Sequence, residues 1–253
     1  MKRPARYTIA SIPHPVKVLG LLTQPAEPFV MVNMLVYKDQ ATGKFAHLTG
    51  REAYSIYAES AMRAQSTMGS RLIWTGEVTE QLAGKALPDF GTVALLEYAR
   101  PTRLFRFMAG GNYDEKARFA GLAGQWLVAA KTLAETPGPV DESDAVLVEV
   151  LSGAAFTERT APGWLATWQR RKEAAGGRLV WMGRAGVQPL GSAKPRLRRF
   201  IVTRFADDAA LDAAFAADDA QPLRNRQVAG LSDYIALRAT TTHEFDEFLA
   251  GDV

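Results

Sequence analysis

Apolar residues alternate along the segment FVMVNMLVY, residues 29–37, with the two-residue period of a β-strand. The even-numbered positions from Val30 to Val36 form one wholly apolar face. The other face carries Asn33 and Tyr37 between apolar residues. The pattern therefore predicts a strand with one cleanly apolar face and one mixed face.

A helix is predicted after this strand and its loop. Thr49 and Glu52 have the spacing of a capping box, and Gly69 is well placed to end the helix. A second helix should begin at Pro101 and be interrupted near Gly110. Further strands are expected over residues 70–78, 92–99 and 121–131. The order β-α-β-β-α-β is that of the ferredoxin-like unit.

The chain contains this series twice. GSRLIWTG at residues 69–76 returns as GGRLVWMG at residues 176–183, an offset of 107. The match extends along the chain, with an offset of 109 at residues 120–122 and of 116 at residues 30–35. The second series predicts a helix near 161–175 capped by Thr160, a helix near 208–229 broken by Pro222, and strands near 145–151, 177–185, 198–205 and 231–239.

The sheet of a ferredoxin-like unit has helices on only one face, so its other face needs a partner. We expect an α+β protein of two ferredoxin-like repeats whose sheets pack face to face into an intramolecular α+β barrel. The expected division is an N-terminal extension at 1–27, repeat 1 at 28–131, a linker at 132–144, repeat 2 at 145–239 and a C-terminal tail at 240–253.

Composition narrows the class of protein. Apolar residues make up 47% of the chain and charged residues 23%, as in soluble globular proteins. With no signal-peptide pattern and no membrane-length apolar run, a cytoplasmic protein without a membrane partner is expected.

The absence of cysteine excludes disulfides, thiolate metal sites and a cysteine nucleophile. The basic run KPRLRR, Lys194 to Arg199, is interpreted as a solvated loop, so no nucleic-acid partner is expected.

Three phrases of the first repeat resemble a known family. VNMLVYK, YSIYAESAMRAQSTMGSRLIWTGEV and VALLEYARPTRLFRFM are similar to the domain-of-unknown-function family thirteen-thirty, in the dimeric α/β-barrel superfamily. The resemblance covers residues 28–131 and is weaker over 145–239, where Glu149 replaces Asn33 and Arg204 replaces Glu97. It implies the fold, whereas activities in the superfamily include cofactor-free monooxygenases, haem enzymes, isomerases and lyases.

Haem is the cofactor that the resemblance brings into question, because some relatives with two units per chain bind it through a histidine in the second unit. The chain has three histidines, His14, His47 and His243, and none lies in a predicted core element. Their spacing gives no paired metal-ligand motif. We therefore expect no haem, no metal and no other cofactor.

Strand alternation indicates a candidate site. Asn33 and the matching Glu149 are expected to point between the two sheets, where a polar group needs a polar network, water or a ligand. We place any pocket in the first unit's half of the barrel, near Asn33, with Tyr37 and Glu97 close by. The long loop at 38–50 would then hold His47 over its mouth as an acid or base, although surface variation also explains that loop.

Glu97 and Arg204 form another matched pair, at the ends of the third strands. They would form a structural salt bridge across the pseudo-twofold axis, or serve as a base and an anion anchor; the first reading is favoured. Trp74 and Trp181 are expected to face the helices as core residues, as are most of the tyrosines.

The favoured function is a small-molecule-binding barrel, or a cofactor-independent enzyme of monooxygenase, isomerase or lyase type, acting on a small anionic or aromatic metabolite. The alternative is a non-catalytic, stress-related or structural protein. The chain should be a monomer, or a homodimer through surfaces other than the intersheet face.

Overall fold

A computed structural model describes residues 7–10, 15–22, 27–84, 87–110, 114–153, 162–193, 196–216 and 231–243. The first unit comprises β2 (Phe29–Tyr37), η1 (Gly43–Phe45), α2 (Gly50–Ser66), β3 (Arg71–Ala83), β4 (Thr92–Tyr98), α3 (Pro101–Gly110), α4 (Glu115–Gly121) and β5 (Leu122–Glu135). The second comprises β6 (Ala145–Ser152), α5 (Pro162–Ala174), β7 (Arg178–Ala185), β9 (Leu197–Phe205), α6 (Asp208–Ala216) and β10 (Asp233–Thr241).

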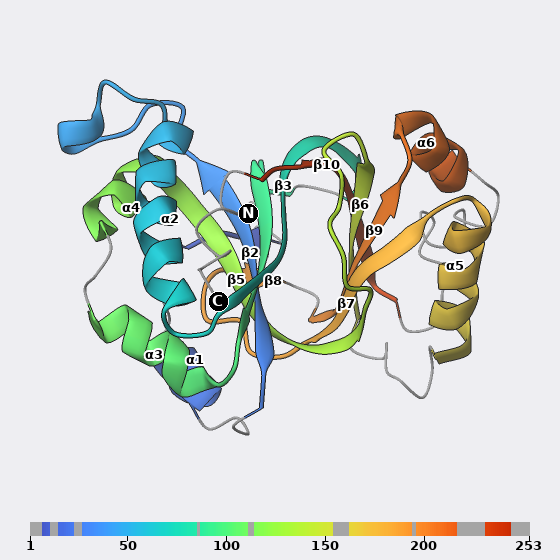
Figure 1. Ribbon diagram of the computed structural model, residues 1–253, viewed down its shortest axis with the longest axis horizontal. Coiled ribbons are helices and arrows are strands. Elements are labelled where there is room, and N and C mark those ends of the chain that lie inside the picture. The colour runs from blue at the N-terminus through green and yellow to red at the C-terminus, as the bar shows by residue number, and fades with distance from the viewer. Residues whose placement is uncertain are drawn as a thin grey trace, which may run out of the picture.

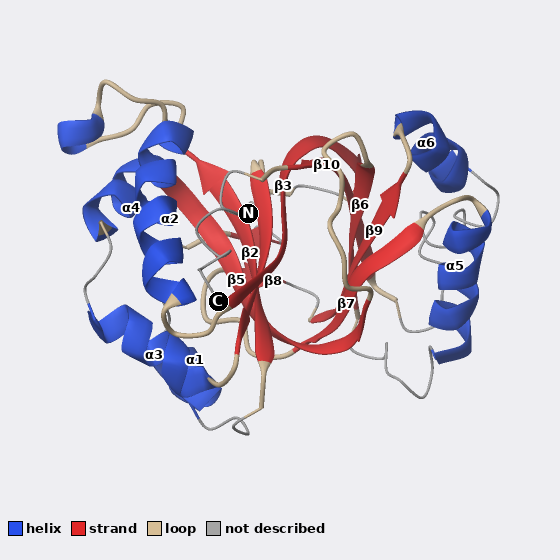
Figure 2. Ribbon diagram, viewed as in Figure 1, coloured by secondary structure: helices blue, strands red, loops and turns tan. Residues whose placement is uncertain are grey.

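Eight strands form one closed antiparallel barrel in the order β10-β3-β4-β2-β5-β7-β9-β6. Each unit contributes four consecutive strands in ferredoxin-like order. The two sheets join edge to edge where β5 pairs with β7 and where β3 pairs with β10. The barrel lies between two helical layers, with α1 (Pro15–Leu22) to α4 on one side and α5 and α6 on the other (Figures 1 and 2). The predicted fold is confirmed.

Strand register confirms the repeat residue by residue. Asn33 lies opposite Ala94 and Leu127 in the first unit, and Glu149 lies opposite Ile201 and Ala236 in the second. These pairs reproduce the sequence offsets of 116, 107 and 109. The two units are therefore equivalent in pairing as well as in element order.

The barrel interior is packed with apolar side chains from both units. The even-numbered positions of β2, from Val30 to Val36, point into it, as do Val146, Val148 and Val150 of β6. Each sheet thus covers the apolar face of the other, as expected. The interior holds side chains where a ligand would otherwise lie.

Trp74 and Trp181 lie inside this barrel and not against the helices, so the expected orientation of both is wrong. A β-bulge causes the difference, since the register of β3 shifts between Leu72 and Trp74, and that of β7 shifts between Leu179 and Trp181. Because an extra residue reverses the alternation of side chains, each tryptophan moves to the interior face.

The repeated phrase places each tryptophan ring over a glycine two residues later. A Cβ atom on Gly76 would lie 2.3 Å from the Trp74 ring, and one on Gly183 would lie 2.1 Å from the Trp181 ring. Neither position has room for a side chain. This contact explains why both copies retain Trp-x-Gly.

The two rings also form crossed hydrogen bonds between the units. Trp74 Nε1 donates to Thr241 Oγ1 at 3.1 Å, and Trp181 Nε1 donates to Thr132 Oγ1 at 3.0 Å. Each bond joins a tryptophan of one unit to a threonine of the other. The repeated phrase therefore forms both junctions of the barrel.

Several local predictions can be compared with the structure. The Thr49 capping box is present, with the Glu52 amide donating to Thr49 Oγ1 at 3.2 Å. β5 continues to Glu135, so the first four residues of the expected linker belong to a strand. The proposed cap Thr160 and the break at Pro222 lie outside the described residues.

Short elements that the sequence pattern did not predict lie before the first unit and within the second. They are β1 (Tyr7–Thr8), α1 (Pro15–Leu22) and β8 (Ser192–Ala193), and β1 pairs with β8. Within the described ranges, no helix combines the length and apolar character that crossing a membrane requires.

Separating the units is expected to cause self-association. A fragment of residues 1–135 would expose the outer edges of β3 and β5 together with the apolar interior face. Size-exclusion chromatography with light scattering should show dimers or aggregates. A soluble, well-folded monomer of this fragment would contradict the arrangement.

Candidate functional site

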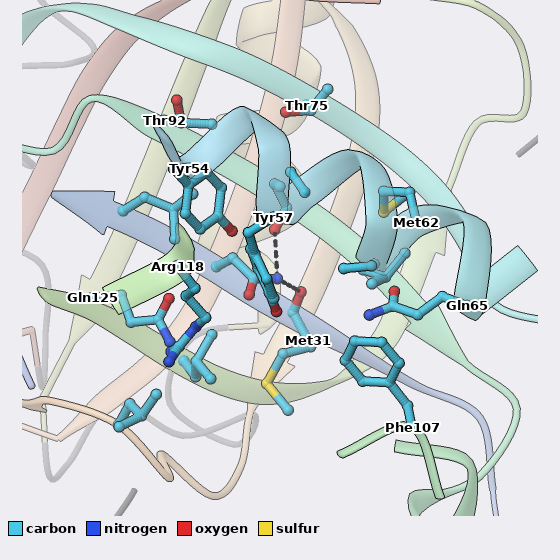
Figure 3. A pocket seen from close by; sticks show the side chains of 18 of the residues that line it. Met31, Tyr54, Tyr57, Met62, Gln65, Thr75, Thr92, Phe107, Arg118 and Gln125 are labelled. Atoms are coloured by element: carbon cyan, nitrogen blue, oxygen red, sulfur yellow. Dashed lines mark hydrogen bonds between the residues drawn. The ribbon is translucent and has the colours of Figure 1, made fainter. Parts of the chain in front are cut away.

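The first unit contains a cavity of about 210 Å³ between its sheet and the helices α2, α3 and α4. Strand residues form the floor and α2 forms one wall. In Figure 3, Arg118 and Gln125 lie toward one end, and Gln65 and Phe107 lie toward the other. The lining is mostly aromatic and aliphatic, with a few polar groups, as is typical of small-molecule sites.

Asn33 lies on the floor of this cavity, with Met31, Leu35 and Tyr37 of the same strand face. It faces the helices, so its expected position between the two sheets is wrong. Asn33 Nδ2 donates to the carbonyl oxygens of Met31 at 2.9 Å and Ala94 at 3.4 Å. Because these bonds use the amide nitrogen, Oδ1 is the atom left to interact with a ligand; no described residue donates to it.

Three tyrosines form a ladder from the sheet to α2. The ring centroids of Tyr37 and Tyr54 are 5.6 Å apart, and those of Tyr54 and Tyr57 are 5.2 Å apart. Tyr37 also donates from its hydroxyl to Thr92 Oγ1 at 2.9 Å. Burial raises the pKa of Tyr54 well above its usual value, and Tyr57 and Tyr37 add to the rise. Tyr54 is therefore a neutral hydrogen-bond donor at neutral pH.

Arg118 of α4 provides a positive charge at one end of the cavity. Its guanidinium carbon lies 5.9 Å from the Tyr57 ring centroid and 5.1 Å from that of Phe119. Within the described part of the chain, no carboxylate forms an ion pair with Arg118. Glu115, one turn earlier on the same helix, also lines the cavity without pairing with it.

Two buried polar atoms in the lining lack hydrogen-bond partners among the described residues. They are Gln65 Oε1 and Thr75 Oγ1, on side chains that are 4% and 2% exposed. An unpaired polar atom of this kind is costly in a protein interior unless water or a ligand reaches it. These two atoms indicate that the cavity is hydrated or holds a ligand.

The equivalent space in the second unit is filled by a hydrogen-bonded network. Lys172 Nζ donates to Glu149 Oε2 at 2.5 Å and to Thr203 Oγ1 at 2.9 Å. The other oxygen of Glu149 accepts from Trp168 Nε1 at 2.9 Å and from the Tyr234 hydroxyl at 2.8 Å. Burial lowers the pKa of Lys172, whereas the Glu149 carboxylate opposes that shift. Glu149 therefore faces the helix α5, so its expected position between the two sheets is wrong.

The repeat relates each residue of this network to a residue that lines the cavity. By the offsets of 116, 107 and 109, Glu149, Trp168, Lys172, Thr203 and Tyr234 correspond to Asn33, Ala61, Gln65, Leu96 and Gln125. A large indole in one unit is replaced by a methyl group in the other. At four of these five positions, all except Leu96, the first unit has the smaller side chain, and the charged pair is replaced by neutral residues. The space that the second unit fills is therefore open in the first unit.

Glu97 lies away from Asn33, contrary to expectation. It pairs in register with Val30, on the strand face opposite to that of Asn33. Arg71 lies directly across from Glu97 on β3, and their ion pair has a distance of 3.2 Å; Arg71 also pairs with Glu135 at 2.6 Å. Glu97 is therefore paired with Arg71 and not with Arg204.

The remaining predicted site residues also lie outside the cavity lining. Arg204 forms an ion pair with Asp144 at 2.9 Å, so the expected salt bridge between Arg204 and Glu97 is wrong. His47 is exposed in its loop and does not line the cavity. Of the predicted residues, only Asn33 and Tyr37 lie in it.

The residues present do not fit a haem in the second unit. The space beside α5 holds Trp168 and the Glu149–Lys172 pair, and no described histidine lies there. His243 follows the end of β10 and His47 lies in the first unit, while His14 is outside the described residues. Elsewhere in the described ranges, no group of three or more potential metal ligands occurs.

Sequence reasoning missed Arg118, Gln65 and Thr75 as site residues. For Gln65, a comparison of the equivalent helices in the two repeats would have provided a signal. At the offset of 107, neutral Gln65 is equivalent to Lys172, and Ala61 is equivalent to Trp168. Such exchanges on a core-facing helix indicate that one copy has lost filling side chains.

Comparison with known proteins supports the fold. No family model matches the chain, and no curated protein matches it in sequence. A "putative monooxygenase" from Lactobacillus acidophilus is 11% identical, with a TM-score of 0.51 over 85% of this chain and 94% of that chain.

Two further solved structures are similar to the chain. A chlorite dismutase variant from Candidatus Nitrospira defluvii is 9% identical, with a TM-score of 0.51 over 90% of this chain and 98% of that chain. A protein of unknown function from Rhodopseudomonas palustris is 20% identical, with a TM-score of 0.43 over 51% of this chain and 100% of that chain. The chain therefore has the tandem ferredoxin-like barrel fold of the monooxygenase-like and chlorite dismutase structures.

Proposed function

We propose that this protein binds a small aromatic or anionic metabolite in the cavity of its first unit. The second unit completes the barrel and provides no ligand site of its own. The observation that carries the proposal is the exchange of large side chains for smaller ones at four equivalent positions, Glu149/Asn33, Trp168/Ala61, Lys172/Gln65 and Tyr234/Gln125, which fill one unit and leave the other open. The two buried, unpaired polar atoms of the lining, Gln65 Oε1 and Thr75 Oγ1, support a polar occupant of this cavity.

The site has the groups to orient a ligand through hydrogen bonds. Tyr54, on the α2 wall, can donate a hydrogen bond to a ligand, and Asn33 Oδ1, on the floor, can accept one. We place the reaction, if substrate is turned over, in the cofactor-independent classes suggested by the barrel superfamily. The name of the L. acidophilus structure and the phrases VNMLVYK and VALLEY support that placement and a relationship to family thirteen-thirty.

Filling the cavity should abolish binding. Ala61→Trp introduces the residue that the second unit has at the equivalent position, and we expect at least a tenfold loss of affinity for any ligand found in a screen of aromatic acids and phenols. Isothermal titration calorimetry measures the affinity, and thermal unfolding checks that the variant folds.

Ile56→Trp is the matched control, because Ile56 lies on the same helix with 40% of its surface exposed and does not line the cavity. It adds the same ring and should bind ligand like the unmodified protein. Ala61→Leu provides a milder filling if the indole prevents folding. Unchanged affinity in folded Ala61 variants would place the site elsewhere.

The packed barrel interior favours a second candidate, a non-catalytic structural protein. In that case the cavity would hold only water, and the screen would yield no ligand displaced by Ala61→Trp. Binding of a ligand with one site per chain would reject this alternative, because only the first unit has the open space.

A further inference from the structure

We propose that the ligand of this cavity carries an anionic group at one end and a hydroxyl at the other, joined by an aromatic body of about two rings. This inference rests on the proposed function and specifies the chemistry of the ligand. Arg118 binds the anionic end and Gln65 binds the hydroxyl.

The anionic end is defined by Arg118. Its guanidinium lies beside the rings of Tyr57 and Phe119, in a mostly apolar lining, and none of the described carboxylates pairs with it. A planar guanidinium binds a carboxylate through two parallel hydrogen bonds. Because Arg118 is half-buried, such a bond is screened less by water here than on an open surface.

The hydroxyl end is defined by Gln65, whose side chain is 4% exposed. Its amide forms no hydrogen bond with any described residue, and Oε1 is fully buried. A hydroxyl both donates and accepts, so it satisfies either atom of an amide. A second anion fits less well, since it can accept from Nε2 but cannot donate to the unpaired Oε1.

Helix geometry sets the length of the ligand. Tyr57, beside Arg118, and Gln65 are eight residues apart on α2, which corresponds to about 12 Å along the helix axis. Hydrogen bonds of about 2.9 Å at each end leave roughly 6–10 Å between the polar groups of the ligand. A fused two-ring system with substituents at opposite ends spans this distance.

The middle of the cavity suits an aromatic body. Tyr54 and Tyr57 supply ring faces from α2, and Met31 and Met62 supply thioethers from the floor and the wall (Figure 3). Both side-chain types interact favourably with aromatic rings. A volume of about 210 Å³ is smaller than the roughly 300–1,000 Å³ of pockets for drug-sized ligands, which limits the ligand to a small metabolite.

Three probes of one shape separate the contributions of the two ends. They are 6-hydroxy-2-naphthoate, 2-naphthoate without the hydroxyl, and 2,6-dihydroxynaphthalene without the anion. Titrated into the full chain, 6-hydroxy-2-naphthoate should bind about tenfold more tightly than either of the other two, with one site per chain.

Two variants should remove the two preferences independently. Arg118→Gln should lower the affinity for both carboxylate probes about tenfold. The affinity for 2,6-dihydroxynaphthalene should change by no more than about twofold. Gln65→Leu should lower the affinity for both hydroxyl-bearing probes. The affinity for 2-naphthoate should change by no more than about twofold. Arg106→Gln, at an exposed arginine of α3 outside the lining, is the control for loss of a positive charge and should change none of the affinities.

The outcomes separate this inference from the function on which it rests. Equal affinity of all three probes, abolished by Ala61→Trp, would retain the binding function and overturn the two-ended ligand. A uniform loss across the probes in Arg118→Gln or Gln65→Leu would likewise overturn it, since a structural defect does not discriminate between ligands. Failure of all three probes to bind would also overturn it, and the wider screen would then test the function alone.

Discussion

Trp181→Ala is expected to lower the free energy of unfolding by about 3–5 kcal/mol. The side chain is fully buried in the barrel interior, packs over Gly183 and donates to Thr132 Oγ1. Truncation leaves a cavity at the junction of the two units and an unpaired threonine hydroxyl. Urea unfolding followed by circular dichroism measures the effect, and a loss below about 1 kcal/mol would contradict this packing.

Two milder variants separate the hydrogen bond from the packing. Trp181→Phe keeps most of the ring, and Thr132→Val keeps the shape of the acceptor side chain. Each should lower the free energy of unfolding much less than Trp181→Ala does. The lost hydrogen bond should account for about 0.5–1.5 kcal/mol of the decrease. If both are made together, their effects should be less than additive, since both remove the same bond.

Lys172→Met is expected to lower the free energy of unfolding by about 3–5 kcal/mol. It removes the only cation that contacts Glu149 among the described residues. Glu149 is 0% exposed, so its carboxylate would remain buried without a counter-charge. The hydrogen bonds from Trp168 and Tyr234 would remain but would not neutralise it. Urea unfolding at neutral pH measures the loss.

The first unit supplies the matched control for this variant. Glu149→Asn combined with Lys172→Gln introduces the neutral residues found at the equivalent positions, Asn33 and Gln65. We expect the double variant to lose less than half as much stability as Lys172→Met, since no buried charge is left unpaired. Equal losses in the two proteins would show that packing, and not charge, determines the effect.

The fold could be predicted from the sequence because two independent patterns agree. Alternation and capping signals define each ferredoxin-like unit, and the repeated phrases show that two units exist. The offsets then match the strand register at every pair compared, including the bulge before each tryptophan. That bulge could not be predicted, because one extra residue leaves no mark in composition and yet reverses the faces of Trp74 and Trp181.

The site could be predicted only in part, for a physical reason. In a closed barrel with helices outside, both faces of each strand are buried. The alternation of residues along a strand therefore shows which residues share a face, but not which face points into the barrel. The wholly apolar face of β2 lies inside, because the packed barrel has no room for water. Asn33 therefore points to the helices, where the cavity lies, and Glu97 to the other face.

Barrel closure also sets an order of events during synthesis of the chain. The outer edge of β3, residues 76–83, pairs with β10, which emerges about 150 residues later. At ~5–20 residues per second, that edge waits roughly 8–30 s for its partner. Glu77 and Glu80 lie on this strand, and charged side chains discourage pairing with other chains. Once β10 is made, Glu80 binds Arg238 at 3.1 Å, so a residue that protects the nascent chain becomes part of the finished barrel.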